Sequence, residues 1–313
     1  NRGKPGLANP LSHNTYCTGM YSTIFRDNMF LRAASMGNKF TANLGAGSVR
    51  EVVVDNNLYV DGEIGISMGG NKPGPLRWVD CRVSNNVMLD LGRSRPTGRH
   101  LAWYVGANDW DGGVIARNLF LHQPRAEIRN VRGLNLSPGA GNEGELRMRD
   151  VIVRGNVCHG LGNARWAIHV GGPDRMRGIA VIKNWLQFPE NAAPLVSVSG
   201  VEPGASFREN VYWSAADADR WFVLGEERLS FEQWVRRSGE QAARREQVEF
   251  PDSSRNIETY MEALGEEPTI DTFIALAREQ SRRNWRPEIT ANAVNDWVRA
   301  GFGVERYAPP ASE

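Results

Sequence analysis

The stretch Val52–Val60, VVVDNNLYV, decides the fold because six other segments repeat its pattern. They are TIFRDNMFL (23–31), CRVSNNVML (81–89), GVIARNLFL (113–121), VIVRGNVCH (151–159), IAVIKNWLQ (179–187) and ASFRENVYW (205–213). The sixth residue of each is an asparagine, and the positions three before and two after it are apolar in all seven copies. The asparagines are Asn28, Asn57, Asn86, Asn118, Asn156, Asn184 and Asn210. A repeat of this period predicts stacked units that bury a continuous core only together.

The apolar positions predict an all-β fold, a right-handed parallel β-helix. Residues five and three before each asparagine, such as Val52 and Val54, alternate with more polar residues, as a strand with one buried face requires. We expect the asparagine to take the left-handed conformation at a bend, and its amide to bond to the matching residue of the next coil. The pattern resembles the pectate-lyase-like superfamily over roughly residues 11–213. That resemblance implies an asparagine ladder between the second and third strands of each coil.

The chain is predicted to have two parts. Residues 1–213 would form about seven coils, and residues 214–313 a mainly helical tail that caps the solenoid. The helical segments are LSFEQWVRRSG, RNIETYMEALG, TIDTFIALAREQSRRN and TANAVNDWVRAGFG. The stretch AREQSRRNWRPEITANAVNDWVRAGFG (277–303) resembles the tails of many secreted bacterial β-helix proteins of unassigned activity, which implies a secreted or periplasmic location. Because residues 1–12 carry no amphipathic helix, we expect a missing segment or a partner chain to cover the first coil.

Composition limits the partners of the protein. The formal net charge of the 313 residues is +1, so no strongly basic field exists to hold nucleic acid. The sequence has no apolar run of about 18 residues that would span a bilayer. The three cysteines occupy separate strand positions and are predicted to be small buried hydrophobes.

A row of side chains is predicted on the outer face of the first sheet. In the pectate-lyase-like superfamily the substrate lies along this sheet. Aligning the glycines at 69, 106, 139, 171 and 200 places Ser67, Tyr104, Ser137 and His169 outward, and Ile66, Trp103, Leu136 and Ile168 inward. Neighbouring rungs lie about 4.8 Å apart, so the row would follow successive sugars. A slip of one residue would reverse every assignment.

The first candidate site combines His13, Tyr16 and Lys39. The separation between His13 and Lys39 is close to one coil, which would stack the His13 imidazole and the Lys39 ammonium on adjacent rungs. A neighbouring cation lowers the pKa of either group, which favours a neutral general base. Lys39 or His13 would remove the proton beside a uronate carboxyl, Tyr16 would donate a proton, and Arg32 or Arg50 would neutralise the carboxyl. The alternative is that Lys39 solvates a turn and His13 bonds to nearby backbone.

The second candidate site contains Arg165, Trp166 and His169, with Asp174 and Arg175 in the next turn. Trp166 would stack on a sugar, and His169 with an arginine would act as base and neutraliser. The alternative is an outward histidine held by a turn carboxylate.

Two further clusters contain carboxylates. Asn108, Asp109 and Asp111 crowd the turn GANDWDGG and would bind a calcium ion, although the spacing is not that of a calcium loop. Alternatively, these side chains cap their own turn. Glu143 and Glu145 are a carboxylate pair that would suit glycoside hydrolysis or a solvated face.

Arginines in the predicted turns favour an acidic glycan as ligand. They are Arg77, Arg93, Arg95, Arg99, Arg132, Arg165, Arg175 and Arg177, and Arg99 is a predicted substrate-binding residue. High arginine content of the whole chain is the competing explanation. Two functions remain open. The first is an enzyme that acts on an acidic polysaccharide by abstracting the C5 proton of a uronate, as a lyase or an epimerase, with a hydrolase or transferase as a variant. The second is a non-catalytic β-helix used as a surface, adhesion or assembly module.

Overall fold

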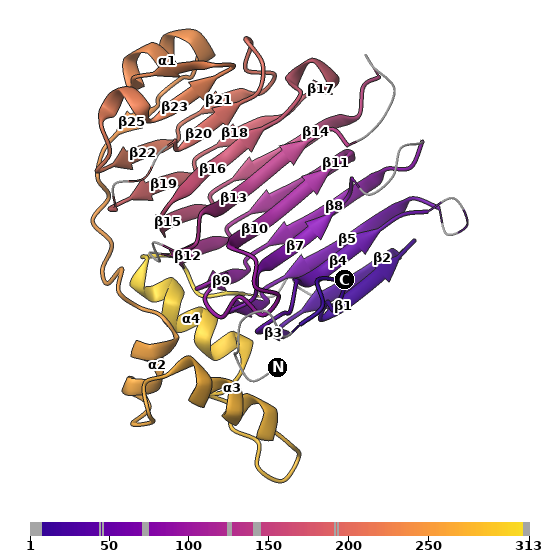
Figure 1. Cartoon of the computed structure of the whole chain (residues 1–313), viewed down its shortest axis with the longest axis vertical. Coiled ribbons are helices and arrows are strands. Elements are labelled where there is room, and N and C mark those ends of the chain that lie inside the picture. Colours follow the sequence, from indigo (N-terminus) through magenta and orange to yellow (C-terminus); the bar gives the residue numbers. More distant parts are fainter. Residues whose placement is uncertain are drawn as a thin grey trace.

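A computed structural model describes residues 8–43, 45, 47–70, 75–123, 127–139, 145–190, 192 and 194–308. The described strands form three sheets that run along the long axis of the molecule, and each coil contributes one strand to each sheet (Figure 1). All pairings between coils are parallel, and the strands account for seven coils. The predicted parallel β-helix is therefore confirmed.

The first sheet contains, in spatial order, β1 (Thr15–Thr18), β4 (Met36–Thr41), β7 (Ile64–Met68), β10 (Leu101–Asn108), β13 (Asn130–Ser137), β16 (Ala164–Val170), β20 (Val196–Val198), β23 (Phe222–Leu224) and β24 (Glu227–Leu229). The second contains β2 (Tyr21–Arg26), β5 (Val49–Asp55), β8 (Trp78–Ser84), β11 (Trp110–Ala116), β14 (Met148–Arg154), β18 (Ala180–Ile182) and β21 (Ser206–Arg208), with β17 (Met176–Arg177) beside β14. The third contains β3 (Met29–Leu31), β6 (Leu58–Val60), β9 (Val87–Leu89), β12 (Leu119–Gln123), β15 (Val157–Leu161), β19 (Trp185–Phe188), β22 (Val211–Ser214) and β25 (Arg244–Arg245). Because β23 continues the first sheet and β24 pairs with it antiparallel, the solenoid extends beyond the predicted boundary at residue 213.

The asparagine ladder lies at the corner between the second and third sheets, as predicted. Each side-chain amide nitrogen donates to the amide oxygen of the asparagine in the next coil, over 2.9–3.0 Å, from Asn28 through to Asn210. From Asn57 to Asn184 the asparagines are buried. Glu240 ends the ladder by accepting a hydrogen bond from the Asn210 amide at 2.7 Å.

One detail of the bend prediction is wrong. The left-handed residue is the one before each ladder asparagine, for example Asn56 (φ 53°), Asn85 (φ 57°) and Arg117 (φ 55°). The ladder asparagine lies between this left-handed residue and the first residue of the following strand.

The interior is filled by the apolar columns that the repeat predicts. Residues two after each ladder asparagine, such as Tyr59, Met88 and Phe120, are buried in one continuous core. Cys81 and Cys158 are buried in that core, and the described cysteines are free thiols. The third sheet is buried on its outer face too, because Leu58, Val87 and Leu119 contact a second apolar cluster formed with the C-terminal helices.

The predicted helices are present as α1 (Phe231–Ser238), α2 (Ile257–Ala263), α3 (Ile270–Glu279) and α4 (Ala291–Gly301), together with two short 3-10 helices at Pro173–Arg175 and Ala218–Arg220. Ser230 caps α1 and Thr290 caps α4 by accepting from backbone N–H groups. Gly239 ends α1 in the left-handed conformation (φ 67°).

Only α1 covers the end of the solenoid. Its Trp234 is buried and stacks on Phe222 of β23, with ring centroids 5.0 Å apart. Helices α2 to α4 lie along the side of the solenoid, against the outer face of the third sheet (Figure 1). The prediction that the whole tail caps the end is thus wrong for these three helices. Within the described residues, no helix combines the length and the apolar character needed to cross a membrane.

Candidate functional site

The outer face of the first sheet carries one straight column of side chains, which we call the outer column. Strand register places its members opposite one another: Tyr16, Lys39, Ser67, Gly106, Asn135, His169 and Ser197. Successive members are one rung, about 4.8 Å, apart. Lys39 and His169 are four rungs apart, which corresponds to roughly 19 Å.

Two members of the predicted row belong to this column and two do not. Ser67 and His169 are half-buried members, as predicted. Ser137 lies in the neighbouring column, opposite Asn108, and its hydroxyl donates to the Pro138 carbonyl. Tyr104 is fully buried and its hydroxyl donates to the Leu121 carbonyl at 3.0 Å, so its predicted place on the outer face is wrong.

The error at Tyr104 has a local cause. In β10 and in β16 two consecutive residues in the middle of the strand are buried in the core, Tyr104 and Val105 in the first and Ala167 and Ile168 in the second. These pairs interrupt the two-residue alternation, so Trp103 lies on the outer face, against Arg132, rather than inward. Ile66, Leu136 and Ile168 are buried as predicted.

The first predicted cluster comes together at the first two coils. The rings of His13 and Tyr16 stack with centroids 5.7 Å apart, and the Lys39 ammonium lies 5.5 Å from the Tyr16 ring centroid. Both ring nitrogens of His13 are shielded from solvent and have no hydrogen-bond partner among the described residues, which excludes the alternative of a histidine bonded to described backbone. Partial burial and the positive charges of Lys39 and Arg99 lower the pKa of His13.

Arg99 reaches this cluster from the long turn between β9 and β10. Its guanidinium donates to the fully buried carboxylate of Glu63 at 2.5 Å and to the Ser35 hydroxyl at 2.8 Å. The Arg99 side chain remains 34% exposed, so one face of the ion pair is open to solvent. Of the two predicted neutralisers, Arg32 is held by Asp61 at 2.8 Å and Arg50 lies on the second sheet. Lys39 and Arg99 are therefore the cations beside His13.

The second predicted cluster forms only in part. Trp166 and His169 stack with ring centroids 4.4 Å apart, and the His169 Nε2 lies 3.2 Å from the Ser199 hydroxyl. Burial lowers the pKa of His169 to about 4. Arg165 and Asp174 are exposed, and Arg175 turns away to donate to the carbonyls of Glu145 and Gly139. The alternative prediction was that a turn carboxylate would hold His169. In the structure the Ser199 hydroxyl, and not a carboxylate, lies beside the His169 ring.

A stack that the sequence reasoning missed joins this cluster to the middle coils. The Arg132 guanidinium lies between two indole rings, 4.2 Å from the Trp103 centroid and 5.1 Å from the Trp166 centroid. Trp103, Arg132 and Trp166 are opposite one another on β10, β13 and β16, and all three are half-buried. Their spacing, close to one coil, is the signal that would have revealed the stack.

The carboxylates predicted to bind calcium are paired with arginines. Asp109 is fully buried and accepts from Arg147 at 2.9 Å and from the Gly139 N–H at 2.7 Å. Asp111 accepts two hydrogen bonds from Arg149, which lower the pKa of the carboxyl. Asn108 donates to the Ser137 carbonyl. Within the described residues no group of three or more His, Cys, Asp or Glu side chains is arranged to hold a metal ion.

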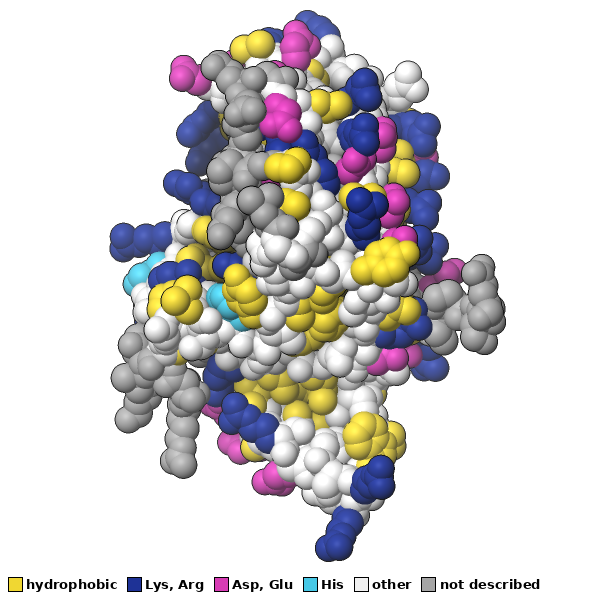
Figure 2. Space-filling model, turned by 90° about the vertical axis from the view of Figure 1, so that its right-hand side faces the viewer, with side chains coloured by type: hydrophobic (Ala, Val, Ile, Leu, Met, Phe, Trp, Pro, Cys, Tyr) yellow, Lys and Arg dark blue, Asp and Glu magenta, His cyan; other side chains and the backbone are white. Residues whose placement is uncertain are grey.

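The remaining carboxylate cluster is also paired with arginines. Glu145 accepts from Arg77 at 2.8 Å and from Arg147 at 3.2 Å, while Glu143 lies outside the described residues. Figure 2 shows basic and acidic side chains interspersed on the side of the molecule at the right of Figure 1, with histidines beside basic side chains at one edge. The turn arginines therefore do not form an uninterrupted basic surface on this side.

Comparisons with known proteins add no functional assignment. No protein-family model matches the chain, and neither curated proteins nor solved structures give a match. The function has to be argued from the geometry of the outer face of the first sheet.

Proposed function

We propose that the protein acts on an acidic polysaccharide that lies along the outer column, and that it abstracts the C5 proton of a uronate next to Lys39. The observation that carries this proposal is the cluster at the first two coils: an imidazole without a hydrogen-bond partner in the described protein, stacked on a tyrosine and flanked by two cations. A lowered pKa keeps His13 neutral near pH 7, as a general base must be.

The four side chains have complementary roles in a lyase reaction. Lys39, with the exposed face of Arg99, neutralises the uronate carboxylate and so makes the C5 proton more acidic. His13 takes that proton, and the C5–H electron pair passes into the carboxylate. It returns to form the C4–C5 double bond as the C4–O bond breaks. Tyr16 gives its hydroxyl proton to the departing oxygen, and solvent afterwards reprotonates Tyr16 and takes the proton from His13.

The stack of Trp103, Arg132 and Trp166 supports binding of a chain rather than of one sugar. It begins on β10, one rung beyond Ser67, and runs beside the outer column toward His169. Indole faces bind the apolar faces of sugar rings, and the guanidinium edge binds a carboxylate. An epimerase would use the same base and cations but return a proton to the opposite face of C5. A hydrolase is less well supported, because no described member of the outer column is acidic.

Membership of the pectate-lyase-like superfamily and a secreted or periplasmic location belong to this proposal. The parallel coils and the asparagine ladder support the first, and the resemblance of the helical tail supports the second. We assign calcium no role through Asn108, Asp109 or Asp111, because arginines already neutralise both carboxylates.

The test is ultraviolet absorbance of unsaturated uronate during incubation with a panel of uronate polymers, with and without calcium. We expect activity that falls at least about 100-fold in His13→Gln and in Lys39→Met, as is typical for loss of a general base or an electrostatic stabiliser. His100→Gln is the matched control, because His100 is exposed and bonds to Arg95 and the Glu127 carbonyl. Activity that survives in His13→Gln would remove His13 from the mechanism.

One observation favours the second candidate, a non-catalytic surface or assembly module. Exposed apolar side chains gather at the first coil: Leu11 is 78% exposed, Tyr16 60%, Tyr21 66% and Ile24 58%. Such side chains beside an open sheet edge suit contact with another chain. Polymer binding without any chemical change, unaffected by His13→Gln, would support the module over the enzyme.

A further inference from the structure

A second candidate binding region lies at the corner between the second and third sheets, away from the first sheet. Two adjoining cavities there have volumes of about 400 and 340 Å³. Both are lined by Asn85, Arg117, Tyr307 and Ala308. The segment 303–308 after α4 thus contributes to the walls of both cavities, which together we call the trough.

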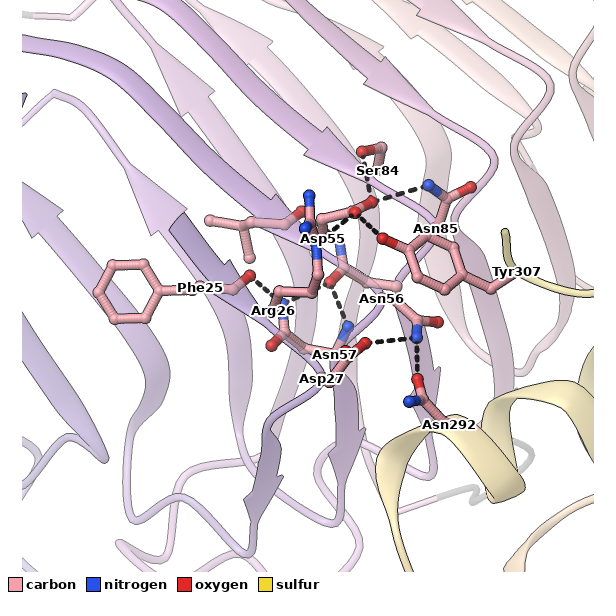
Figure 3. Close-up of polar contacts among 12 residues, drawn as sticks. Phe25, Arg26, Asp27, Asp55, Asn56, Asn57, Ser84, Asn85, Asn292 and Tyr307 are labelled. Atoms are coloured by element: carbon pink, nitrogen blue, oxygen red, sulfur yellow. Dashed lines mark hydrogen bonds and ion pairs between the residues drawn. The ribbon is translucent and has the colours of Figure 1, made fainter. Parts of the chain in front are cut away.

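Polar contacts hold this segment in place. The Tyr307 hydroxyl donates to the Asp55 carboxylate, which also accepts from Ser84 and Asn85 (Figure 3). Helix α4 is bound to the same corner, where Arg299 donates to the Asn56 side chain at 2.7 Å. The walls of the trough are therefore built from residues far apart in sequence.

The smaller cavity has an excess of positive charge. Three arginines line it, Arg117, Arg299 and Arg306, against a single acidic side chain, Glu305. Arg299 is buried, bonds to Asn56 and the Asn85 carbonyl, and forms an ion pair with Asp296 at 3.4 Å, so it offers no free donor and its charge is offset. The excess charge comes from the other two arginines. Arg117 and Arg306 are exposed, and neither forms an ion pair with a carboxylate of the described residues. Their guanidinium groups are thus available to an anion.

Aromatic rings supply a second kind of contact in this cavity. Trp185 is half-buried and lines it together with Tyr307. Indole and phenol faces pack against the apolar face of a sugar ring. A volume of about 340 Å³ is within the range of small-molecule sites and accommodates one or two sugar rings.

We propose that this cavity binds a carboxylated sugar, with Arg117 and Arg306 on the carboxylate and Trp185 against the ring. The site is separate from the outer column and does not depend on the proposed lyase or epimerase reaction. It would hold a uronate unit of a chain, or a free uronate, on a different side of the solenoid.

The experiment is isothermal titration of the whole chain at low ionic strength with D-glucuronate, D-glucose and acetate. We expect glucuronate to bind at least about tenfold more tightly than glucose, which lacks the charge, or acetate, which lacks the ring. Arg117→Asn removes the guanidinium and keeps a residue that tolerates the positive φ of 55°. This change and Arg306→Gln should each weaken glucuronate binding about tenfold. Arg154→Gln, an exposed arginine on the neighbouring β14, is the matched control and should bind normally.

The outcomes separate this site from the first. Binding that is lost in Lys39→Met but retained in Arg117→Asn would place glucuronate on the first sheet and overturn this proposal. Absence of glucuronate binding to the unmodified chain would overturn it as well. Binding lost in Arg117→Asn and retained in Lys39→Met and His13→Gln supports it, whatever the outcome for the lyase reaction.

Discussion

At the scale of single residues, each interior ladder asparagine is hydrogen-bonded to the coils on both sides of it. Asn118 donates to the Asn156 side chain and to the Val83 carbonyl, and its oxygen accepts from the backbone and the side chain of Asn86. All of these groups are buried. Removing one rung therefore leaves several buried polar groups without partners, and each costs about 1–3 kcal/mol.

The replacement Asn118→Ala should accordingly lower the free energy of unfolding by roughly 3 kcal/mol or more. Asn28→Ala is the matched control, because Asn28 is the exposed first rung and water can replace its bonds. We expect this control to cost about 1 kcal/mol or less. Urea unfolding of both variants measures the difference, and equal losses would show that burial of the ladder does not matter.

Glu240 shows why the ladder stops where it does. Its two carboxylate oxygens accept from Asn210, Tyr212 and Trp234 at 2.7–2.9 Å. A residue with only acceptors satisfies the last amide without offering a donor to a further coil. Burial raises the pKa of this carboxyl, while the hydrogen bonds oppose that rise.

At the scale of elements, the contact between the third sheet and the C-terminal segments contains two histidines, of which His159 is buried and His122 half-buried. His159 of β15 packs edge-on against Phe250 and Phe302, with ring centroids 5.4 Å away in both cases. His122 of β12 lies beside it and its Nε2 contacts the Arg255 carbonyl at 3.1 Å. Burial lowers the pKa of both, and that of His159 to about 4.

The pH dependence of stability follows from these pKa values. Above pH 6.5 His159 is neutral in the folded and the unfolded chain and contributes no pH dependence. Below pH 6.5 the unfolded chain binds a proton that the folded chain refuses until about pH 4, so stability falls between these values. From pH 7 to pH 5 the loss from His159 should be about 2 kcal/mol.

The variant His159→Phe should therefore lose about 2 kcal/mol less than the unmodified chain when the pH is lowered from 7 to 5. Urea unfolding at both pH values gives the comparison, and His100→Phe on an exposed turn is the control. An unchanged pH dependence in His159→Phe would show that this histidine does not resist protonation in the folded protein.

At the scale of the whole molecule, the solenoid and helices α2 to α4 depend on each other. The outer face of the third sheet presents fully buried aliphatic side chains to the helices, among them Leu58, Leu89 and Leu121. Without the helices this face would be a continuous exposed apolar stripe.

A chain that ends after Arg245 should consequently associate and bind a hydrophobic dye, whereas the full chain should do so less. The same shortened chain with Leu89→Lys and Leu121→Lys is the control, and we expect these charges to restore much of its solubility. Light scattering after size exclusion measures the association. A shortened chain that stays as dispersed as the full chain would contradict the role of the helices as a cover.

Much of the candidate site was predictable, because stacking converts sequence spacing into distance. His13, Tyr16 and Lys39 meet since their separation is close to one coil, and Ser67 and His169 share the outer column. Tyr104 was misplaced because two consecutive residues, Tyr104 and Val105, are buried and so interrupt the alternation of side chains, and nothing in the local composition marks this interruption. The cover over the third sheet had a readable signal: LYV, VML and LFL are apolar at three consecutive positions, as a strand buried on both faces requires.

The amino-acid sequence by itself determined the coils, the asparagine ladder and the four helices, because each follows from a local period that repeats. Only the tertiary structure decided where helices α2 to α4 pack, which carboxylates arginines neutralise, and that Tyr307 reaches Asp55. These contacts join residues whose separation follows no repeat, so their partners depend on how the tail folds back across the solenoid. The chemistry proposed for the outer column rests on contacts that follow the sequence repeat. The proposed binding cavity at the corner of the second and third sheets rests on contacts that follow no repeat.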